Sequence, residues 1–551
     1  MKKKIEFSDQ TKKIIILGWD GATFKILDEM VEKGLMPNLK NIINNGVRSE
    51  LLSTIPPITG PAWTSFNTGK KPEGHGVFSF FKSPSESLDI ADIERHDARS
   101  IDGLSYWNIL NHSGKKCIVV DFPLTDPVEE IDGLMISGML SRGRRKALVY
   151  PESVKKEIEK ELSIFFEKAI TDGINVSESY LNHLIRSLEE KSELDLYLMR
   201  NKQWDLFSTV YSAVDTLQHY FWNYIDPTSI QYTKNSGIKK KIDEFFIKLD
   251  DILGKYCDEL GSEGNLIVVS DHGFGPKDYI FYVNNFLLKN DYLSLESENL
   301  SRAKYKYILK KIMYKLDIFN LKRFVKIETR GKINRSLEPI AKIDWAHSKA
   351  GFRSNNEYGV YINRKGKYPG GIVEDEEYDS VMENLIKGFL NERNSFNGEK
   401  IFKQVLPGYS IYPGGKHSAD APDIMLIPER GVTLGGFNYS DLEVVLKENS
   451  GLLTGFHEPE GIFIGFGPGF ENGCVITDPL FIYDIAPIIL HLAGIEPLMD
   501  MDGNIVQGIL NSDNVRRKKV RSSGIKKKFV GVDDFNDSET IEALRGLGYL
   551  D

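Results

Sequence analysis

Short apolar runs recur along the chain, and segments with helical periodicity separate them. Four of the runs contain several β-branched residues: 13–18, 116–121, 205–212 and 264–270. Runs of this kind are typical of strands that are buried on both faces of a parallel sheet. Residues 423–428 and 461–466 predict two further strands.

The segments between these runs carry apolar residues at the spacing of an amphipathic helix. They predict helices over residues 22–43, 62–67, 103–112, 151–162 and 478–492. Proline suits the first turn of a helix and acidic side chains suit its positive end, so Pro151-Glu152 and Asp478-Pro479 mark two helix starts. The alternation of strands and helices predicts an α/β sandwich around a mostly parallel central sheet, with helices on both faces.

Two stretches interrupt this alternation. Residues 151–200 are dominated by charged helical sequence, and residues 285–345 are rich in lysine with apolar residues at helical spacing. We expect both to be helical caps inserted at the edge of the sheet where loops vary most freely. The second stretch is basic and amphipathic, which suits peripheral contact with an anionic membrane surface or an anionic substrate, although a solvated helical insertion is the simpler interpretation.

Composition narrows the class of protein. A chain of 551 residues is too long for one simple core, and 41% apolar and 27% charged residues are ordinary for a soluble globular protein. The net charge of -9 gives no global basic surface for specific nucleic-acid binding. No apolar run approaches the roughly 20 residues of a transmembrane segment, and the N-terminal apolar stretch is too short for a secretory signal.

Cysteine usage points to the compartment. Cys117, Cys257 and Cys474 lie far apart and form no CxxC pair. They are interpreted as buried thiols in a reducing environment, because no disulfide framework is visible. We therefore predict a cytoplasmic protein.

Metal-capable side chains follow or adjoin several of the apolar runs. Asp and neutral His are ligands that suit Zn²⁺ or Mn²⁺, and ligands at the ends of successive strands can converge in space. A hydroxyl residue, Thr59, lies in a further patch between the first two groups. The pattern indicates a two-metal hydrolase, with these candidate ligands: Asp20, Asp215, His219, Asp271, His272 and His457.

Each patch taken alone has a simpler structural explanation. Asp271-His272 precedes Gly273 and could be a capped turn with a surface histidine. Asp215 and His219 share a helical face, but surface helices produce such pairs by chance. His457 alone is an ordinary loop histidine. Thr59 could be a helix N-cap, and several neighbouring hydroxyls mean that spacing alone does not select it.

The patches taken together resemble the type I phosphodiesterase / nucleotide pyrophosphatase family of the alkaline phosphatase superfamily, over about residues 13–495. The family pattern appears here in the following order: Asp20-Gly21, Pro37-Asn38-Leu39, Thr59-Gly60-Pro61, Thr68-Gly69, then Asp215 with His219, Ser270-Asp271-His272-Gly273 and Gly455-Phe456-His457. The resemblance implies an alkaline-phosphatase-like sandwich carrying helical cap insertions. The order of the motifs is far more specific than any one of them.

The resemblance also implies a ligand set and a mechanism. Asp215, His219 and His457 would hold one divalent ion, and Asp20, Asp271 and His272 would hold a second, with Thr59 as a further ligand and as the nucleophile. The ions are expected to be zinc, with manganese as an alternative. The implied reaction is hydrolysis of a phosphodiester or pyrophosphate bond in a small phosphorylated substrate, such as a nucleotide or a glycan-linked phosphate, through a phospho-threonine intermediate.

One departure from the family pattern concerns the substrate. Family diesterases usually place an asparagine about twenty residues after the nucleophile, but this chain reads His75-Gly-Val-Phe-Ser-Phe-Phe-Lys82 there. Ser79 or Lys82 could replace it, and Arg353 is a candidate anion clamp because guanidinium binds phosphate bidentately. The choice between diester and monoester stays open. A phosphomonoesterase or a phosphoryl-group transferase of the same fold, and an inactive binding or scaffold protein, are the alternatives.

The predicted division of the chain follows from these assignments. Residues 1–12 form an N-terminal extension and 13–510 the catalytic domain, with its caps at about 151–200 and 285–345. Residues 511–551 form a basic linker and a C-terminal helix. The run of lysine and arginine at 516–528 is interpreted as a flexible linker to the amphipathic segment at the end of the chain.

Overall fold

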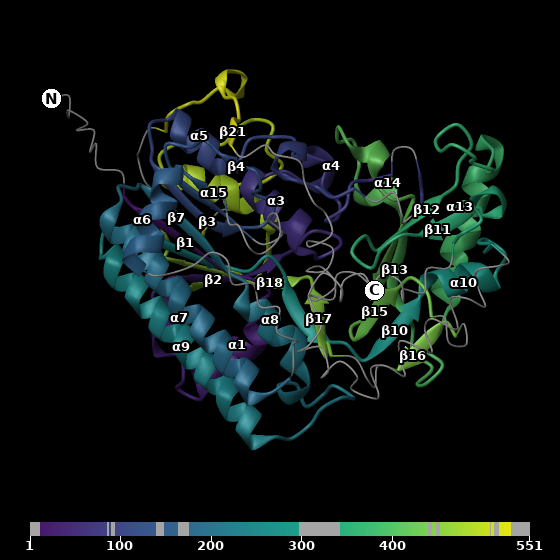
Figure 1. The fold of residues 1–551 in the computed structure, drawn as a ribbon, viewed down its shortest axis with the longest axis horizontal. Coiled ribbons are helices and arrows are strands. Elements are labelled where there is room, and N and C mark those ends of the chain that lie inside the picture. Colours follow the sequence, from purple (N-terminus) through teal and green to yellow (C-terminus); the bar gives the residue numbers. More distant parts are fainter. Residues whose placement is uncertain are drawn as a thin grey trace.

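In the computed structural model the chain forms a large α/β body with a smaller lobe beside it (Figure 1). The structure describes residues 12–84, 87–89, 94–138, 148–162, 176–296, 342–438, 443–447, 452–506, 508–511 and 517–530. Most of the second predicted cap, at 297–341, and the predicted C-terminal helix lie outside the described residues. Within them, no helix is long and apolar enough to cross a membrane.

A 10-stranded sheet forms the centre of the large body. Its strands lie in this order: β19 (Cys474–Val475), β2 (Val47–Leu52), β18 (Glu460–Phe466), β8 (Asn265–Val269), β1 (Ile14–Trp19), β7 (Leu206–Tyr211), β3 (Cys117–Phe122), β5 (Gly133–Ser137) and β6 (Val149–Tyr150), with β20 (Leu480–Phe481) also paired to β2. The pairs β8–β1, β1–β7, β7–β3 and β3–β5 are parallel, whereas β18 and β6 run antiparallel to their neighbours. The predicted mostly parallel sheet is confirmed.

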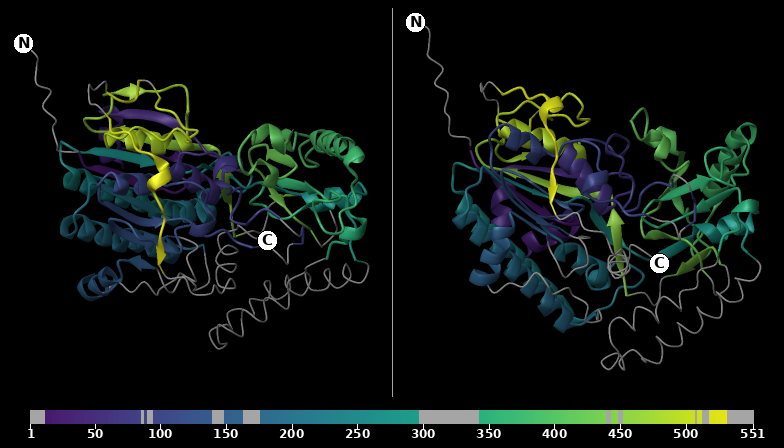
Figure 2. Two further views of the ribbon diagram at one scale, coloured as in Figure 1. Left: turned by 90° about the horizontal axis from the view of Figure 1, so that it is seen from above. Right: turned by 45° about the horizontal axis from the view of Figure 1, so that its top comes forward.

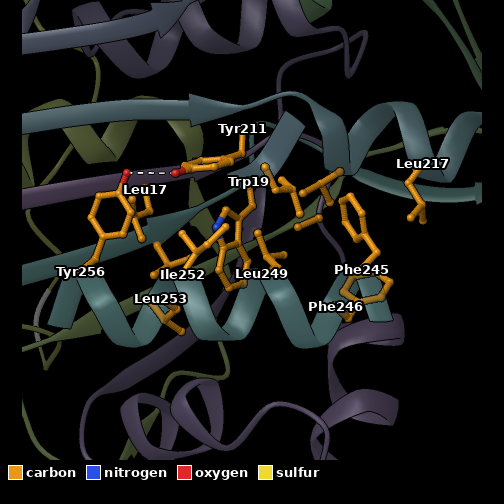
Figure 3. Close-up of a cluster of buried hydrophobic side chains, with 14 of the residues drawn as sticks. Leu17, Trp19, Tyr211, Leu217, Phe245, Phe246, Leu249, Ile252, Leu253 and Tyr256 are labelled. Atoms are coloured by element: carbon orange, nitrogen blue, oxygen red, sulfur yellow. Dashed lines mark hydrogen bonds between the residues drawn. The ribbon is translucent and has the colours of Figure 1, made fainter. Parts of the chain in front are cut away.

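Helices cover both faces of this sheet. One face packs against α1 (Phe24–Glu32), α2 (Pro37–Asn44), α6 (Glu152–Leu162), α7 (Glu178–Asn201), α8 (Ala213–Phe221) and α9 (Ser236–Leu260). The other packs against α3 (Thr59–Thr68), α5 (Tyr106–His112) and α15 (Ile485–Leu492), with the short α4 (Pro72–His75) after α3. Figure 3 shows Leu17 and Trp19 of β1 meeting Leu249 and Ile252 of α9 in the first of these cores.

The smaller lobe has two sheets of its own. One contains β15 (Val432–Gly435), β10 (Tyr279–Tyr282) and β16 (Val445–Lys447), and the other β11 (Ala350–Phe352), β12 (Gly359–Ile362), β14 (Ile424–Pro428) and β13 (Phe402–Pro407). The helices α10 (Val283–Lys289), α13 (Asp375–Asn391) and α14 (Gly408–Ile411) accompany them on this side (Figure 2). A two-stranded ribbon, β9 (Gly273–Pro276) with β17 (Gly455–Glu458), belongs to neither lobe sheet.

The structure corrects several element boundaries. The helix predicted at 22–43 is two helices, because Gly34 adopts a positive φ of 74° and Pro37 starts α2. The predicted helix at 478–492 begins only at Ile485, after the short strand β20. The strand predicted at 423–428 forms, but it lies in the smaller lobe. In the first predicted cap, α7 packs along α9 and covers the sheet.

The basic segment after residue 516 is not a free linker where it is described. Its strand β21 (Phe529–Val530) pairs antiparallel with β4 (Val128–Glu129), and the Lys518 N–H donates to the Gly494 carbonyl. Lys527 turns inward, with Nζ 3.3 Å from the Ile101 carbonyl oxygen. Backbone pairing therefore holds this lysine-rich segment on the α/β body. Cys117 is buried as expected, but Cys257 and Cys474 are only half-buried.

A carboxylate from α9 caps the N-terminus of α2. Asp250 is 1% exposed and accepts hydrogen bonds from the N–H groups of Asn38 and Leu39 at 3.0 and 2.8 Å. We predict that Asp250→Ala lowers the free energy of unfolding by about 1–3 kcal/mol, because a buried and a part-buried N–H donor lose their acceptor. Urea denaturation would measure this, with the exposed neighbour Asp251→Ala as control. Equal stability of the two variants would contradict the capping role.

Candidate metal centre

The parallel strands at the middle of the sheet bring the predicted ligands together. Because β1 lies between β7 and β8, the residues that follow these three strands meet at one edge of the sheet. Asp20 follows β1, Asp271 and His272 follow β8, and α8 carries Asp215 and His219 directly after β7. The ribbon strand β17 adds His457. The structure groups these six residues as two sets of three potential metal ligands, all buried.

The first cluster joins Asp215 and His219 of α8 with His457 of β17. Its three ligand atoms form a nearly equilateral triangle, with 3.1 Å between the two Nε2 atoms, 3.4 Å from His219 Nε2 to Asp215 Oδ1, and 3.3 Å from His457 Nε2 to the same oxygen. Ligands at about 2.0–2.1 Å from a tetrahedral zinc ion lie about 3.3–3.4 Å apart. The triangle therefore has the dimensions of one zinc site.

The second cluster contains Asp20, Asp271 and His272. His272 Nε2 lies 3.6 Å from Asp20 Oδ1 and 3.3 Å from Asp271 Oδ2. The Thr59 hydroxyl completes this cluster, because its Oγ1 is 3.2 Å from the same His272 nitrogen. The Gly21 N–H donates to Asp271 Oδ1 at 3.2 Å and leaves the other carboxylate oxygen directed at the cluster.

Backbone carbonyls fix how all three histidines present their rings. Each Nδ1 lies against a carbonyl oxygen, with these partners: His219 with Gly455 at 3.0 Å, His457 with Pro57 at 3.0 Å and His272 with Gly273 at 3.1 Å. A carbonyl oxygen only accepts, so Nδ1–H donates and Nε2 carries a lone pair. Burial lowers the pKa of His219 to about 4 and of His457 to about 3, so both rings are neutral at pH 7. Their Nε2 lone pairs therefore face each other, an arrangement that a cation between them would stabilise.

The carboxylates are buried with too few hydrogen-bond donors. Among the described residues, both oxygens of Asp20, Oδ1 of Asp215 and Oδ2 of Asp271 have no hydrogen-bond partner. Burial raises the pKa of Asp215 to about 6 and of Asp271 to about 7. Burial and then the neighbouring Asp271 raise the pKa of Asp20 well above its ordinary value. Buried carboxylates are normally paired or bound to metal, so these unpartnered oxygens suit the binding of two cations.

Thr59 is the first residue of α3 and is fully buried. The N-cap position belongs to Ile58, so the simpler explanation of Thr59 as a side-chain N-cap is wrong. Neighbouring hydroxyls have other partners: Thr64 Oγ1 donates to the Gly60 carbonyl at 2.7 Å, and Ser65 Oγ lies 2.9 Å from His75 Nε2. Among these hydroxyls, the structure brings that of Thr59 to the second cluster.

Sequence reasoning missed two residues that shape the site. The Phe274 ring packs edge-on against His219, at 4.8 Å between ring centroids, and lies 5.3 Å from the His457 ring. Gln218 donates from Nε2 to the Gly21 carbonyl at 2.7 Å and thereby ties α8 to the turn after β1. Both residues lie within two positions of a predicted ligand in the sequence, but an apolar ring and an amide have no metal-ligand signature.

The three predicted substrate contacts have other partners in the structure. Ser79 Oγ donates to the Phe81 carbonyl at 3.0 Å and accepts from its N–H at 2.9 Å. Lys82 pairs with Glu94 at 2.9 Å on the surface. Arg353 is buried, with Nη1 3.8 Å from Glu357 Oε1. Their roles toward substrate stay predictions, and none of these contacts supports them.

Because the carboxyl of Asp271 is buried, we predict that replacing it changes the free energy of unfolding in a direction that metal binding reverses. Its pKa of about 7 lies above the unfolded value of about 3.9, so this carboxyl lowers the free energy of unfolding progressively as pH rises from about 4 to about 7. In metal-free protein at pH 8, Asp271→Asn should therefore increase stability by on the order of 1–4 kcal/mol, and by much less at pH 5. With excess Zn²⁺ the wild type should be the more stable protein. Urea denaturation at both pH values, with and without zinc, would measure this, and a destabilised metal-free variant at pH 8 would contradict it.

Comparison with known proteins identifies the family of this chain. The chain matches the family model of type I phosphodiesterase / nucleotide pyrophosphatase over residues 14–451. Comparison with curated protein sequences gives no match. The structure of human ectonucleotide pyrophosphatase/phosphodiesterase 5 is similar at 15% identity and a TM-score of 0.50, covering 91% of this chain and 100% of that one. Phosphonoacetate hydrolase from Sinorhizobium meliloti, in complex with phosphonoformate, is similar at 16% identity and a TM-score of 0.50, covering 88% of this chain and 96% of that one.

These findings establish the fold and the family. At such low identity the two solved structures show the alkaline-phosphatase-like fold alone, whereas the family match spans most of the chain. The match ends before His457, which the structure nevertheless brings beside Asp215. The chain therefore belongs to the type I phosphodiesterase / nucleotide pyrophosphatase family of the alkaline phosphatase superfamily.

Proposed function

We propose that this protein hydrolyses a phosphodiester or pyrophosphate bond in a small phosphorylated substrate, with Thr59 as the nucleophile and two divalent cations as cofactors. Family membership supports the reaction class. The observation that carries the proposal is the pair of buried three-ligand clusters, whose carboxylate oxygens lack partners among the described residues, with the Thr59 hydroxyl beside one of them.

The donor set favours zinc as the ion in each cluster. Asp215, His219 and His457 would hold one ion, and Asp20, Asp271 and His272 the other. Mixed carboxylate and neutral imidazole ligands suit Zn²⁺, with Mn²⁺ as the alternative. When bound, the ions would lower the pKa of the Thr59 hydroxyl and neutralise charge on the transferring phosphoryl group.

The position of Thr59 suits nucleophilic attack on phosphorus. At the first residue of α3, the backbone N–H groups and the helix dipole favour both an alkoxide and an incoming phosphate. Thr59 Oγ1 would form the new bond to phosphorus while the bond to the ester or phosphate leaving group breaks. Water would then hydrolyse the phospho-threonine and restore the free hydroxyl.

Two features favour a diester or pyrophosphate over a monoester. The family is one of phosphodiesterases and nucleotide pyrophosphatases. The proposed nucleophile is threonine, whereas phosphate monoesterases of this superfamily typically use serine. The asparagine expected about twenty residues after Thr59 is absent, so diester preference is the part of the proposal that assay must decide.

A matched pair of threonine variants tests the proposal. Thr59→Ala should reduce turnover of a bis-aryl phosphodiester by at least about 1,000-fold, because the nucleophile is removed. The protein should still bind two zinc ions, because the three Asp and His ligands of each cluster remain. Thr64 lies on the same helix and its hydroxyl donates to the Gly60 carbonyl, so Thr64→Ala should retain turnover. Rates with Zn²⁺ or Mn²⁺ and elemental analysis of the bound metal would measure both effects.

The outcomes separate the alternatives. Full activity of Thr59→Ala would reject the nucleophile. Preference of the wild type for an aryl monoester would make it a phosphomonoesterase. Two bound ions with no hydrolysis of either substrate would favour a phosphoryl-group transferase, and absence of bound metal would favour a scaffold protein.

A further inference from the structure

A cavity of about 280 Å³ lies at the same edge of the sheet as the metal-ligand clusters. It is bounded by α7, by the end of β7, by the first turn of α8 and by Asp121 at the end of β3. The α8 residues Ala213 and Thr216 line it, whereas Asp215 and His219 project from a different face of the same helix into the first metal-ligand cluster. In open α/β sheets, ligands bind outside the carboxyl ends of the strands, where this cavity lies.

Asp121 has an unusual backbone that directs its side chain. The pairing of β3 with β5 shifts register between Val120 and Phe122, so Asp121 is a bulge residue, and its φ is +60°. Positive φ is uncommon outside glycine, and bulges near sites often re-aim a side chain. The Asp121 carboxylate lies 2.7 Å from Lys191 Nζ, and its side chain stays 40% exposed.

A buried network of hydrogen bonds, centred on Asp195, contacts Lys191. Asp195 Oδ2 lies 3.7 Å from Lys191 Nζ and accepts hydrogen bonds from Tyr256 at 2.7 Å and Thr209 at 2.9 Å. The Tyr256 hydroxyl is also 3.0 Å from that of Tyr211, the bond drawn in Figure 3. Burial lowers the pKa of Lys191, but the carboxylates of Asp121 and Asp195 outweigh burial and raise it, so the ammonium stays charged. The cavity therefore has a fixed cation and a fixed anion on one wall.

The lining selects a class of ligand. Carboxylates of Asp121 and Glu190 outnumber the single ammonium of Lys191, so the cavity disfavours a phosphate group. Carboxylates accept hydrogen bonds from hydroxyl groups. The hydroxyls of Ser187 and Thr216 donate to the carbonyls of Leu184 and Ser212 at 2.7 and 3.2 Å, so toward the cavity their oxygens act as further acceptors. Leucine side chains of α7 supply an apolar wall. A volume just below the usual 300–1,000 Å³ of ligand pockets suits one ring-sized group.

We propose that this cavity binds a neutral polyhydroxylated group, such as a hexose, and that this group is the alcohol portion of the phosphodiester substrate. The assignment of that group to the substrate rests on the proposed hydrolase function, whereas the binding site itself does not. The phosphoryl group would occupy the metal-ligand clusters, and the first turn of α8 would separate the two subsites.

Binding tests the site without requiring turnover. Saturation-transfer NMR with methyl glucoside should detect saturable binding to the full-length protein, with a dissociation constant of about 1–10 mM, which is only about 3–4 kcal/mol. Ser187→Phe, which fills the cavity from the surface of α7, should abolish binding, and Asp121→Asn should weaken it about fivefold. Lys248→Met removes an ion pair with Glu189 away from the cavity and should bind like the wild type. No saturable binding by the wild type, or unchanged binding by Ser187→Phe, would overturn the site.

A substrate pair tests the role in catalysis. The wild type should hydrolyse an aryl phosphodiester of glucose with a higher kcat/KM than the matching ethyl diester. This ratio should fall about tenfold in Ser187→Phe, equivalent to about 1.4 kcal/mol of lost interaction. Glucoside binding without hydrolysis of either diester would uphold the site and reject the proposed function. Hydrolysis of both esters with an unchanged ratio would reject the substrate role of the cavity.

Discussion

Two imidazole nitrogens that each carry a lone pair lie 3.1 Å apart, and this pairing constrains the rest of the structure. The Nδ1 atoms of His219 and His457 donate to backbone carbonyls, so neither Nε2 has a proton with which to bridge the gap. The buried carboxylate of Asp215 faces the same point, and one of its oxygens has no hydrogen-bond partner in the described part of the chain. Such an arrangement is stable in the fold when positive charge lies between these groups.

The scaffold holds this pairing from widely separated parts of the chain. The parallel neighbours β7, β1 and β8 deliver the carboxylates to one edge, while the ribbon of β9 and β17 delivers His457 from the far end of the sequence. The carbonyls that orient these histidines come from equally distant segments, because Pro57 precedes α3 and Gly455 lies beside His457 in β17. The orientation of α3, which carries Thr59, and the tautomer of His457 are therefore linked by one hydrogen bond.

Much of the fold could be predicted from the sequence, because strands buried on both faces have a recognisable pattern. Strands buried on both faces read as uninterrupted apolar runs, so β1, β3, β7 and β8 match their predicted ranges within about a residue at each end. The same runs do not say which sheet a strand joins, and 423–428 therefore formed β14 in the smaller lobe. The basic segment after residue 516 looked like a linker because its anchoring uses backbone pairing, which side-chain charge does not reveal.

The candidate site, like the fold, could be predicted from the sequence only in part. The sequence predicted the six candidate ligands as one site only through family motifs, since no spacing within the chain relates His457 to Asp215. The bulge and positive φ of Asp121 have no sequence signature, and the cavity between α7 and α8 was not predicted.

The most direct test of the two-metal site is an X-ray structure of the zinc-loaded protein, with anomalous differences collected at the zinc absorption edge. We expect two peaks about 4 Å apart, one among Asp215, His219 and His457 and one among Asp20, Asp271 and His272, each about 2.0–2.2 Å from its ligand atoms. A single peak, or peaks bound by other side chains, would contradict the two-metal site.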